Sequence, residues 1–162
     1  MNAFVYRGWE VEWDEAGVCS LRPSGAADTE GADAYKVREW LDVYLSGREP
    51  DFTPPLHLGG SPFQQRVWQL LLQIPYGTTT TYGHLARLLD TSDKRMSSQA
   101  VGQAVGRNPV ALIVPCHRVV GAGGRLTGYA YGLELKRQLL LLERGERKNS
   151  PFGRSQSQSD NL

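Results

Sequence analysis

The chain has 162 residues, of which 40% are hydrophobic and 22% charged. This length suits one compact domain, or one small domain with a short appendage, and the composition excludes a wholly disordered chain. No stretch approaches the about 18 apolar residues of a membrane span, and the charged N-terminus lacks the apolar segment of a secretory signal, so a cytoplasmic protein is expected.

Charge divides the chain into two parts. Residues 1–60 hold 5 Lys and Arg against 11 Asp and Glu, whereas residues 61–145 hold 10 against 4. A basic segment is suited to binding a polyanion, and nucleic acid is the first candidate. Mutual attraction of the two segments explains the same division, and charge alone does not separate these two interpretations.

The first 46 residues predict a small sheet with one helix. Residues 3–13 are rich in aromatic and β-branched types and alternate loosely, which favours a strand. A turn at 14–17 and a returning strand at 18–21 follow. After a Pro/Ser/Gly/Ala loop at 22–31, residues 32–46 carry apolar side chains at helical spacing.

Three prolines and two glycines between Glu49 and Gly60 indicate a linker. We place the linker at 54–60, between an N-terminal α/β domain at 1–53 and a second domain at 61–146. The polar tail at 147–162 is of low complexity and is expected to be disordered.

The second domain begins with a strong helix signal. Ser61 is suited to the N-cap, Pro62 to the first helical position, and Gln64 completes a capping box. Further elements are predicted as helices at 82–89, about 97–105 and 133–143, with a β segment at 110–114. Helix, turn, small-residue helix and then strand is the order of a winged helix-turn-helix, so the expected fold class is α/β (α+β).

The tetrad Pro115–Arg118 (PCHR) follows the apolar run at 111–114. A cysteine that leaves a buried strand is held rigidly, and an adjacent imidazole can take its proton to form a nucleophilic thiolate. Cys116 and His117 therefore form a candidate reactive pair. An inert core cysteine beside a chance histidine explains the same residues, and Cys-His alone does not decide between the two.

Several further motifs carry a family resemblance. In chain order they are Phe63–Trp68 (FQQRVW), Ile74–Gly77 (IPYG), Thr81-Tyr82, Ala100–Gly102 (AVG), Arg107–Val110 (RNPV), Ile113–Val120 (IVPCHRVV), Gly128-Tyr129 and Gly132-Leu133. Together they resemble the O6-alkylguanine-DNA alkyltransferases, or methylated-DNA–protein-cysteine methyltransferases, over about residues 61–145. Residues 1–60 match only in general character, since the family places a small β-sheet domain there.

The resemblance implies direct-reversal DNA repair, with stoichiometric and irreversible transfer of the alkyl group from O6-alkylguanine to Cys116. O4-alkylthymine is a further candidate lesion. His117 would act as base through a water, Glu143 would orient His117, and Asn108 would shape the site. The residues alone support simpler interpretations, in which Glu143 is a solvated charge at a helix end and Asn108 only stabilises a turn.

The partner implied is double-stranded DNA, bound by a monomer without a cofactor. The target carbon lies inside the duplex, so the base must be flipped out. In the family a helix-turn-helix enters the minor groove, where Ser98 would lie and the small face of Ala100, Gly102 and Ala104 would permit close approach. Tyr82 would push the target 3′-phosphate, or it is simply an aromatic that packs at a helix start.

The resemblance also assigns the alkyl pocket. Tyr129 would donate its hydroxyl to the guanine, and the carbonyls of Cys116 and Val119 would accept from the exocyclic amine. The N–H near Ala130 would contact O6. Tyr131 stands where some members have glycine and is expected to narrow the pocket.

Tyr131 is one departure from relatives, and position 99 is the other. The arginine that usually precedes Ala-Val-Gly is replaced by Gln99, which we expect to fill the gap left by the flipped base while Arg95 contacts phosphate. Lys94 or Arg95 in that gap is the alternative. Some relatives bind zinc through N-terminal Cys and His residues, but Cys19 and His57 do not supply four ligands, so no metal is expected.

Two other functions remain open. A damage-recognition module, like the alkyltransferase-like proteins, binds the lesion but lacks the reactive cysteine, so Cys116 argues against it. A DNA-binding regulator suits a winged helix, but the Pro115–Arg118 motif disfavours it.

Overall fold

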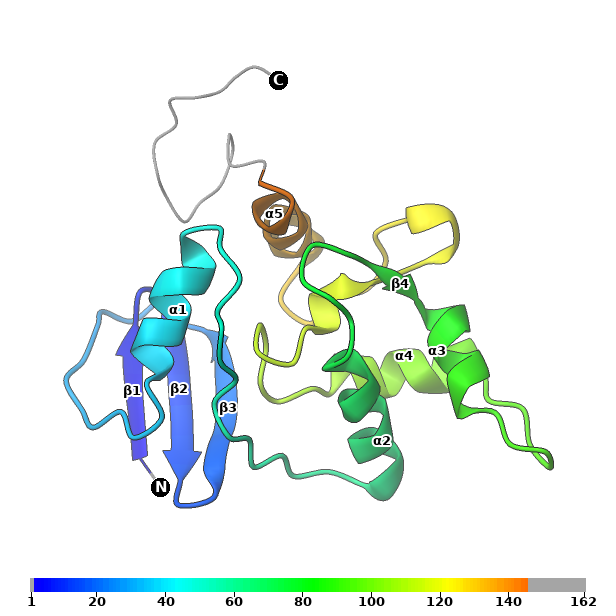
Figure 1. Ribbon diagram of the computed structural model, residues 1–162, viewed down its shortest axis with the longest axis horizontal. Coiled ribbons are helices and arrows are strands. Elements are labelled where there is room, and N and C mark those ends of the chain that lie inside the picture. The colour runs from blue at the N-terminus through cyan, green and yellow to red at the C-terminus, as the bar shows by residue number, and fades with distance from the viewer. Residues whose placement is uncertain (1, 146–162) are drawn as a thin grey trace.

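The computed structural model describes residues 2–145 (Figure 1). Its N-terminal part is a three-stranded antiparallel sheet in the order β1-β2-β3, formed by β1 (Asn2–Tyr6), β2 (Trp9–Asp14) and β3 (Gly17–Pro23). Helix α1 (Val37–Leu45) lies on one face of this sheet and buries its apolar side. The predicted tail, 147–162, falls outside the described residues.

The strand predicted at 3–13 is wrong, because these residues form a hairpin. Tyr6 pairs with Trp9, which leaves Arg7 and Gly8 as a two-residue turn. Both have positive φ angles, 50° and 89°, as the turns that match strand twist require. The loose alternation of the sequence therefore belongs to two strands.

The first helix begins later than predicted, at Val37 rather than at residue 32. The carboxylate of Asp33 accepts hydrogen bonds from the backbone N–H groups of Val37 and Arg38, both at 2.8 Å. This side chain satisfies free N–H groups of the first turn, and the chain before it is not helical.

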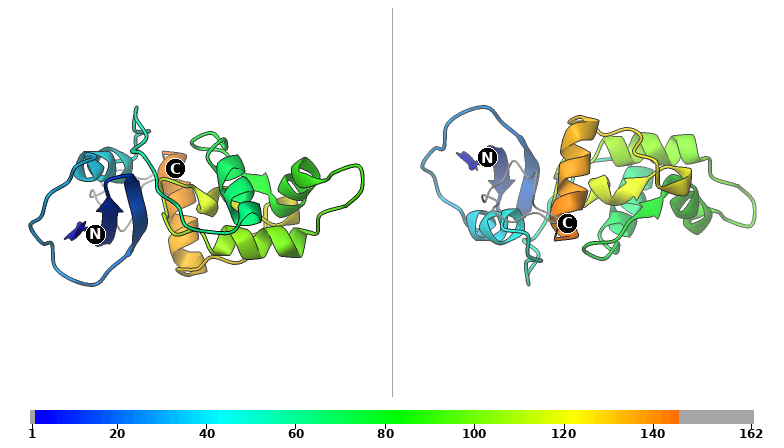
Figure 2. Two further views of the ribbon diagram at one scale, coloured as in Figure 1. Left: turned by 90° about the horizontal axis from the view of Figure 1, so that it is seen from below. Right: turned by 90° about the horizontal axis from the view of Figure 1, so that it is seen from above.

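The C-terminal part is mainly helical. It contains α2 (Pro62–Leu71), α3 (Tyr82–Leu89), α4 (Ser98–Gly106) and α5 (Leu133–Glu143), close to the predicted ranges. The capping box of α2 is confirmed, since Ser61 and Gln64 exchange both predicted hydrogen bonds. Figure 2 shows α5 between the sheet and the other three helices.

The β segment predicted at 110–114 is wrong. Val110 makes one isolated parallel bridge to Leu21, and Leu112, with φ 69°, reverses the chain in a buried turn. Asn108 holds this turn from inside: its amide donates to the Val114 carbonyl at 2.8 Å, and its side-chain oxygen accepts from Val110 N–H. The short parallel pair of this part is instead β4 (Thr80–Thr81) with β5 (Val119–Val120).

The sheet and the helices share one hydrophobic core. The predicted linker at 54–60 runs along β3, where Val18 N–H donates to the Pro55 carbonyl and His57 N–H to the Val18 carbonyl, both at 2.8 Å. A Cβ on Gly17 would lie 2.6 Å from the Pro55 carbonyl oxygen, so glycine permits this approach. The division into domains at 1–53 and 61–146 stays a prediction.

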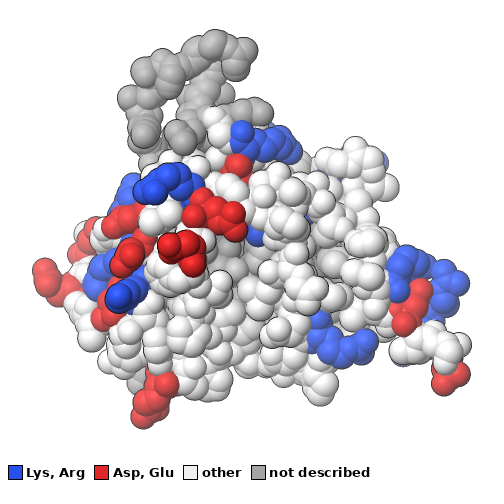
Figure 3. Space-filling model, viewed as in Figure 1, with Lys and Arg blue, Asp and Glu red and all other residues white. Residues whose placement is uncertain are grey.

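Acidic side chains gather around the sheet and α1 (Figure 3), as the charge division of the sequence indicates. Among residues 2–145, no helix combines the length and the apolar character needed to cross a bilayer.

Candidate active site and nucleic-acid interface

A pocket of about 560 Å³ opens beside Cys116. Its walls come from the start of α3, one face of α4 and the segment 127–131. The lining residues are Tyr82, Ser98, Gln99, Gly102, Gln103, Val105, Gly106, Asn108, Cys116, Thr127, Gly128, Tyr129, Ala130 and Tyr131. Nine of the predicted site residues therefore meet around one cavity, although 49 positions separate Tyr82 from Tyr131.

Cys116 is 7% exposed and begins a 3₁₀ helix, η1 (Cys116–Arg118). The expected exit from a buried strand is therefore corrected: the turn built around Asn108 holds the cysteine. Burial raises the pKa of the Cys116 thiol, while a hydrogen bond from Asn108 and the charge of Lys136 act in the opposite direction. The thiol thus needs a base to form its thiolate.

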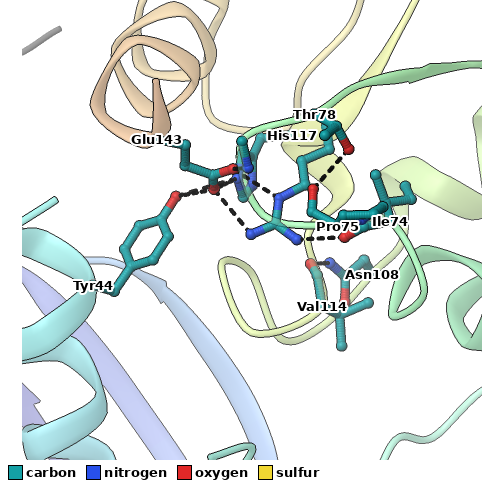
Figure 4. A network of polar contacts seen from close by, with 10 residues as sticks. Tyr44, Ile74, Pro75, Thr78, Asn108, Val114, His117 and Glu143 are labelled. Atoms are coloured by element: carbon teal, nitrogen blue, oxygen red, sulfur yellow. Dashed lines mark hydrogen bonds and ion pairs between the residues drawn. The ribbon is translucent and has the colours of Figure 1, made fainter. Parts of the chain in front are cut away.

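His117, the residue after the cysteine, forms a buried pair with Glu143 of α5 (Figure 4), and we call this side of the site the back of the cysteine. His117 Nε2 lies 2.6 Å from Glu143 Oε2. A carboxylate only accepts, so the imidazole proton belongs on Nε2, and Nδ1 is left as an acceptor. Within residues 2–145, buried Nδ1 has no hydrogen-bond partner.

The electrostatics keep this pair ready to take a proton. Burial by itself raises the pKa of Glu143, but hydrogen bonds and charges of His117 and Arg118 outweigh it and bring the value to about 2. Burial lowers the pKa of His117 below its usual 6.5. A neutral imidazole beside an ionised carboxylate is the arrangement that a general base requires.

Three further donors hold the Glu143 carboxylate. Arg118 Nε and Nη2 lie 2.8 and 3.1 Å from its two oxygens, Gly77 N–H donates to Oε1 at 3.0 Å, and the Tyr44 hydroxyl donates to Oε2 at 2.6 Å. Arg118 also donates to the Ile74 carbonyl at 2.7 Å. The residues alone suggest that Glu143 is a solvated charge at a helix end. The structure shows instead that its carboxylate is buried and paired.

Three of the predicted DNA-contacting residues of α4 line the pocket. Ser98 and Gln99, in the first turn of α4, are exposed, and Gly102 faces the Tyr82 ring. Tyr82 donates its hydroxyl to the Thr127 carbonyl at 3.1 Å.

Two other predicted DNA-contacting residues stand apart from the pocket lining. Ala100 is half-buried on α4. Arg95 lies before this helix, three-quarters exposed, and its Nε is 3.1 Å from Asp90 Oδ2. Since α4 begins at Ser98, Arg95 does not share a helix face with Gln99.

Of the predicted base-binding residues, Tyr129, Ala130 and Tyr131 line the pocket, and Val119 does not. The rings of Tyr129 and Tyr131 meet edge-to-face at 5.6 Å, and the buried Tyr129 hydroxyl has no partner within residues 2–145. Val119 lies buried in β5, and its N–H donates to the Cys116 carbonyl. That carbonyl retains a second lone pair.

Sequence reasoning missed Tyr44, Arg118 and Lys136. The fully buried Lys136 ammonium donates to the carbonyls of Thr127 and Gly128 at 3.1 and 2.9 Å, and burial lowers its pKa to about 8. Its position seven residues before Glu143, on the same face of α5, was a usable signal. Tyr44 is 99 residues from Glu143, and no local pattern connects the two.

A third candidate metal ligand was also missed. Asp14 lies with Cys19 and His57 so that three ligand atoms fall within 4.8 Å of one another. His57 Nδ1 is 2.8 Å from Asp14 Oδ2 and 3.9 Å from Cys19 Sγ. Because one histidine nitrogen serves both contacts, a hydrogen bond to Asp14 accounts for the arrangement.

A buried cysteine next to a His–Glu pair, in a pocket walled by a helix-turn-helix, has the groups that transfer of a group to a cysteine sulfur needs. Residues 62–145 match the model of the 6-O-methylguanine DNA methyltransferase DNA-binding domain. The chain is 46% identical over 126 residues to the methylated-DNA–protein-cysteine methyltransferase of Mycolicibacterium paratuberculosis, covering 77% of this chain and 74% of that protein. It is 43% identical over 117 residues to the inducible methylated-DNA–protein-cysteine methyltransferase of Bacillus subtilis, covering 72% of this chain and 63% of that protein.

Solved structures agree with the sequence relatives. The crystal structure of Mycobacterium tuberculosis OGT in complex with DNA matches with a TM-score of 0.74 and 35% identity, covering 89% of this chain and 92% of that one. The chain belongs to the 6-O-methylguanine DNA methyltransferase family.

Proposed function

We propose that this protein repairs double-stranded DNA by moving an alkyl group from O6 of guanine to Cys116, once per molecule and irreversibly. It acts as a cytoplasmic monomer without a cofactor. The observation that carries the proposal is the Cys116 thiol beside the pocket, with the His117–Glu143 pair behind it. Family membership supports the same reaction.

The reaction begins with the thiol proton. His117 Nδ1 accepts it through a water, and Glu143 stabilises the imidazolium that forms. The thiolate sulfur attacks the alkyl carbon, so that a C–S bond forms while the bond to O6 breaks and its electron pair stays on the guanine. The guanine takes up one proton, which balances the proton lost by the thiol, and the thioether left on Cys116 is not turned over.

The pocket wall stabilises the leaving base. The Tyr129 hydroxyl donates to the guanine as negative charge develops, and the backbone N–H near Ala130 contacts O6. The carbonyls of Cys116 and Val119 accept from the exocyclic amine. Tyr131, half-buried at the pocket, favours small alkyl groups over bulky ones.

DNA docking places the lesion before this pocket. Helix α4 enters the minor groove, where Ser98, Ala100 and Gly102 allow a close approach. Flipping the base costs a few kcal/mol of stacking and pairing, and Gln99 offsets part of this cost by filling the gap. Tyr82 pushes the 3′-phosphate.

Intact mass spectrometry tests the proposal. After incubation with excess duplex that contains O6-methylguanine, the wild-type protein should gain one methyl group per molecule. Cys116→Ser should gain none while it still binds the duplex. A wild-type protein that binds the lesion but never gains a methyl would be a damage-recognition module, and one that ignores the lesion but binds DNA would be a regulator.

A further inference from the structure

Tyr44 reaches the reactive site from the N-terminal part of the chain (Figure 4). Its side chain is fully buried on α1. The hydroxyl lies 2.6 Å from Glu143 Oε2 and 3.2 Å from His117 Nε2. Trp40 stacks on the ring at 5.2 Å and 10°, so the hydroxyl has little freedom to turn away.

We infer that Tyr44 is a positioning residue of the relay, through which the N-terminal domain sets the tautomer and the basicity of His117. The inference deepens the proposed function and rests on it. Tyr44 contacts neither the thiol nor the pocket, so it acts through Glu143.

The hydroxyl can satisfy only one of its two neighbours as a donor. If it donated to Nε2, the imidazole proton would have to sit on Nδ1, and His117 could not accept the thiol proton there. The shorter contact, to the ionised carboxylate, is the stronger one. With Glu143 Oε2 accepting from both Tyr44 and His117, the proton stays on Nε2 and Nδ1 stays free.

The same hydrogen bond moderates the basicity of His117. Burial raises the pKa of the Tyr44 phenol well above 10, so the phenol stays a donor at all relevant pH values. By neutralising part of the carboxylate charge, the phenol weakens the pull of Glu143 on the imidazolium. The other titratable or charged groups around His117 are Arg118 and Cys116 from its own turn and Lys136 from α5.

The test compares Tyr44→Phe with Tyr35→Phe. Tyr35 is also a tyrosine of the N-terminal part, and its hydroxyl donates to the backbone carbonyls of Asp14 and Glu15, away from the relay. Each variant loses a hydroxyl, but only Tyr44→Phe loses the contact with Glu143. The readouts are the His117 pKa and tautomer from ¹⁵N NMR, and the single-turnover rate of methyl transfer across pH.

In Tyr44→Phe the His117 pKa should rise by about 0.5 unit or more, because the full charge of Glu143 then acts on it. The acidic limb of the rate profile should move to higher pH with it. The plateau rate should fall about 10-fold, since a misplaced base loses part of its catalysis. Tyr35→Phe should change neither quantity.

A second measurement does not depend on removing the hydroxyl. Fluorinated tyrosine at position 44 makes the phenol a stronger donor without a cavity, so the His117 pKa should fall rather than rise. If the His117 pKa were unchanged in both Tyr44→Phe and the fluorinated protein, the inference would be overturned, and Tyr44 would only pack in the core. Because NMR needs no substrate, a wild-type protein that failed to take a methyl would refute the proposed function while the role of Tyr44 was still decided.

Discussion

The two sides of Cys116 differ in how completely their polar groups are paired. Behind the cysteine, the Glu143 carboxylate accepts from four residues, and the side chains of Tyr44, His117, Arg118 and Glu143 are buried. In front of it, Ser98 and Gln99 are exposed and the Tyr129 hydroxyl has no partner within the described chain. The Glu143 carboxylate is therefore fully paired in the free protein, and His117 Nδ1 is the one acceptor left open among the His117, Arg118 and Glu143 side chains, whereas the front has several polar groups available for a ligand.

This difference separates chemistry from recognition. A buried carboxylate whose oxygens are all paired resists rearrangement, because each lost partner leaves a polar group without water. Substitutions behind Cys116 should therefore change the rate with any substrate. Substitutions at the exposed residues of α4 in front of it should change only how duplex DNA is handled.

The largest effect is expected for His117→Gln. Loss of the base should slow methyl transfer about 10²-fold or more, equally on duplex DNA and on a free alkylated guanine base. In the wild type, the rate should begin to fall only below pH 6.5, because burial lowers the His117 pKa. Single-turnover kinetics measure both, and equal rates for variant and wild type would show that another group activates Cys116.

Glu143→Gln should cost about 3 kcal/mol of unfolding free energy at pH 7, because it leaves the buried Arg118 guanidinium without its charge partner. Glu143 has a folded pKa of about 2 against 4.5 normally. A depressed carboxyl pKa stabilises the folded state above the unfolded value, so the deficit should shrink as pH falls from 4.5 towards 2. Urea denaturation at several pH values measures this, and a deficit independent of pH would contradict the account.

Lys136→Met should slow transfer about 10-fold near neutral pH, because the thiolate loses a nearby cation and the segment 127–128 loses two hydrogen bonds. Because the pKa of Lys136 is about 8, the difference in transfer rate between wild type and variant should be largest below pH 8, where Lys136 is charged. The difference should become smaller above pH 8. Arg137→Met, at the next position but paired with exposed Glu134, is the control and should keep the wild-type rate.

The smallest effect is expected in front of the cysteine. Gln99→Arg should speed repair of duplex DNA about 5-fold, since a guanidinium in the gap stacks better and adds about 1 kcal/mol. Reaction with the free base should not change. Arg95→Ala should weaken DNA binding and its salt dependence without altering the chemical step. If Arg95→Ala abolished duplex repair while Gln99→Ala left it unchanged, Arg95 would be the residue that fills the gap left by the flipped base.

Local signals predicted what lies close in sequence. The capping box at Ser61 is a contact between neighbours along the chain, and Cys116 and His117 are adjacent, so both were visible. The same holds for the positions of α3, α4 and α5.

Contacts between distant segments were not predictable in this way. Arg7-Gly8 looked like part of one strand because its turn uses backbone angles that arginine seldom adopts. The apolar residues 110–114 suggested a strand, but Asn108 satisfies their backbone in a buried turn. Tyr44 looked like one more apolar helix position, and only the packing of α1 against α5 gives it a partner.

The central claim is that Cys116 is the acceptor, and tandem mass spectrometry of peptides from the reacted protein tests it most directly. The protein is incubated with duplex that carries isotope-labelled O6-methylguanine and is then digested. The account predicts one labelled methyl thioether, on the peptide that contains Cys116, and an unmodified peptide around Cys19. A label on Cys19, or transfer that persists in Cys116→Ser, would contradict it.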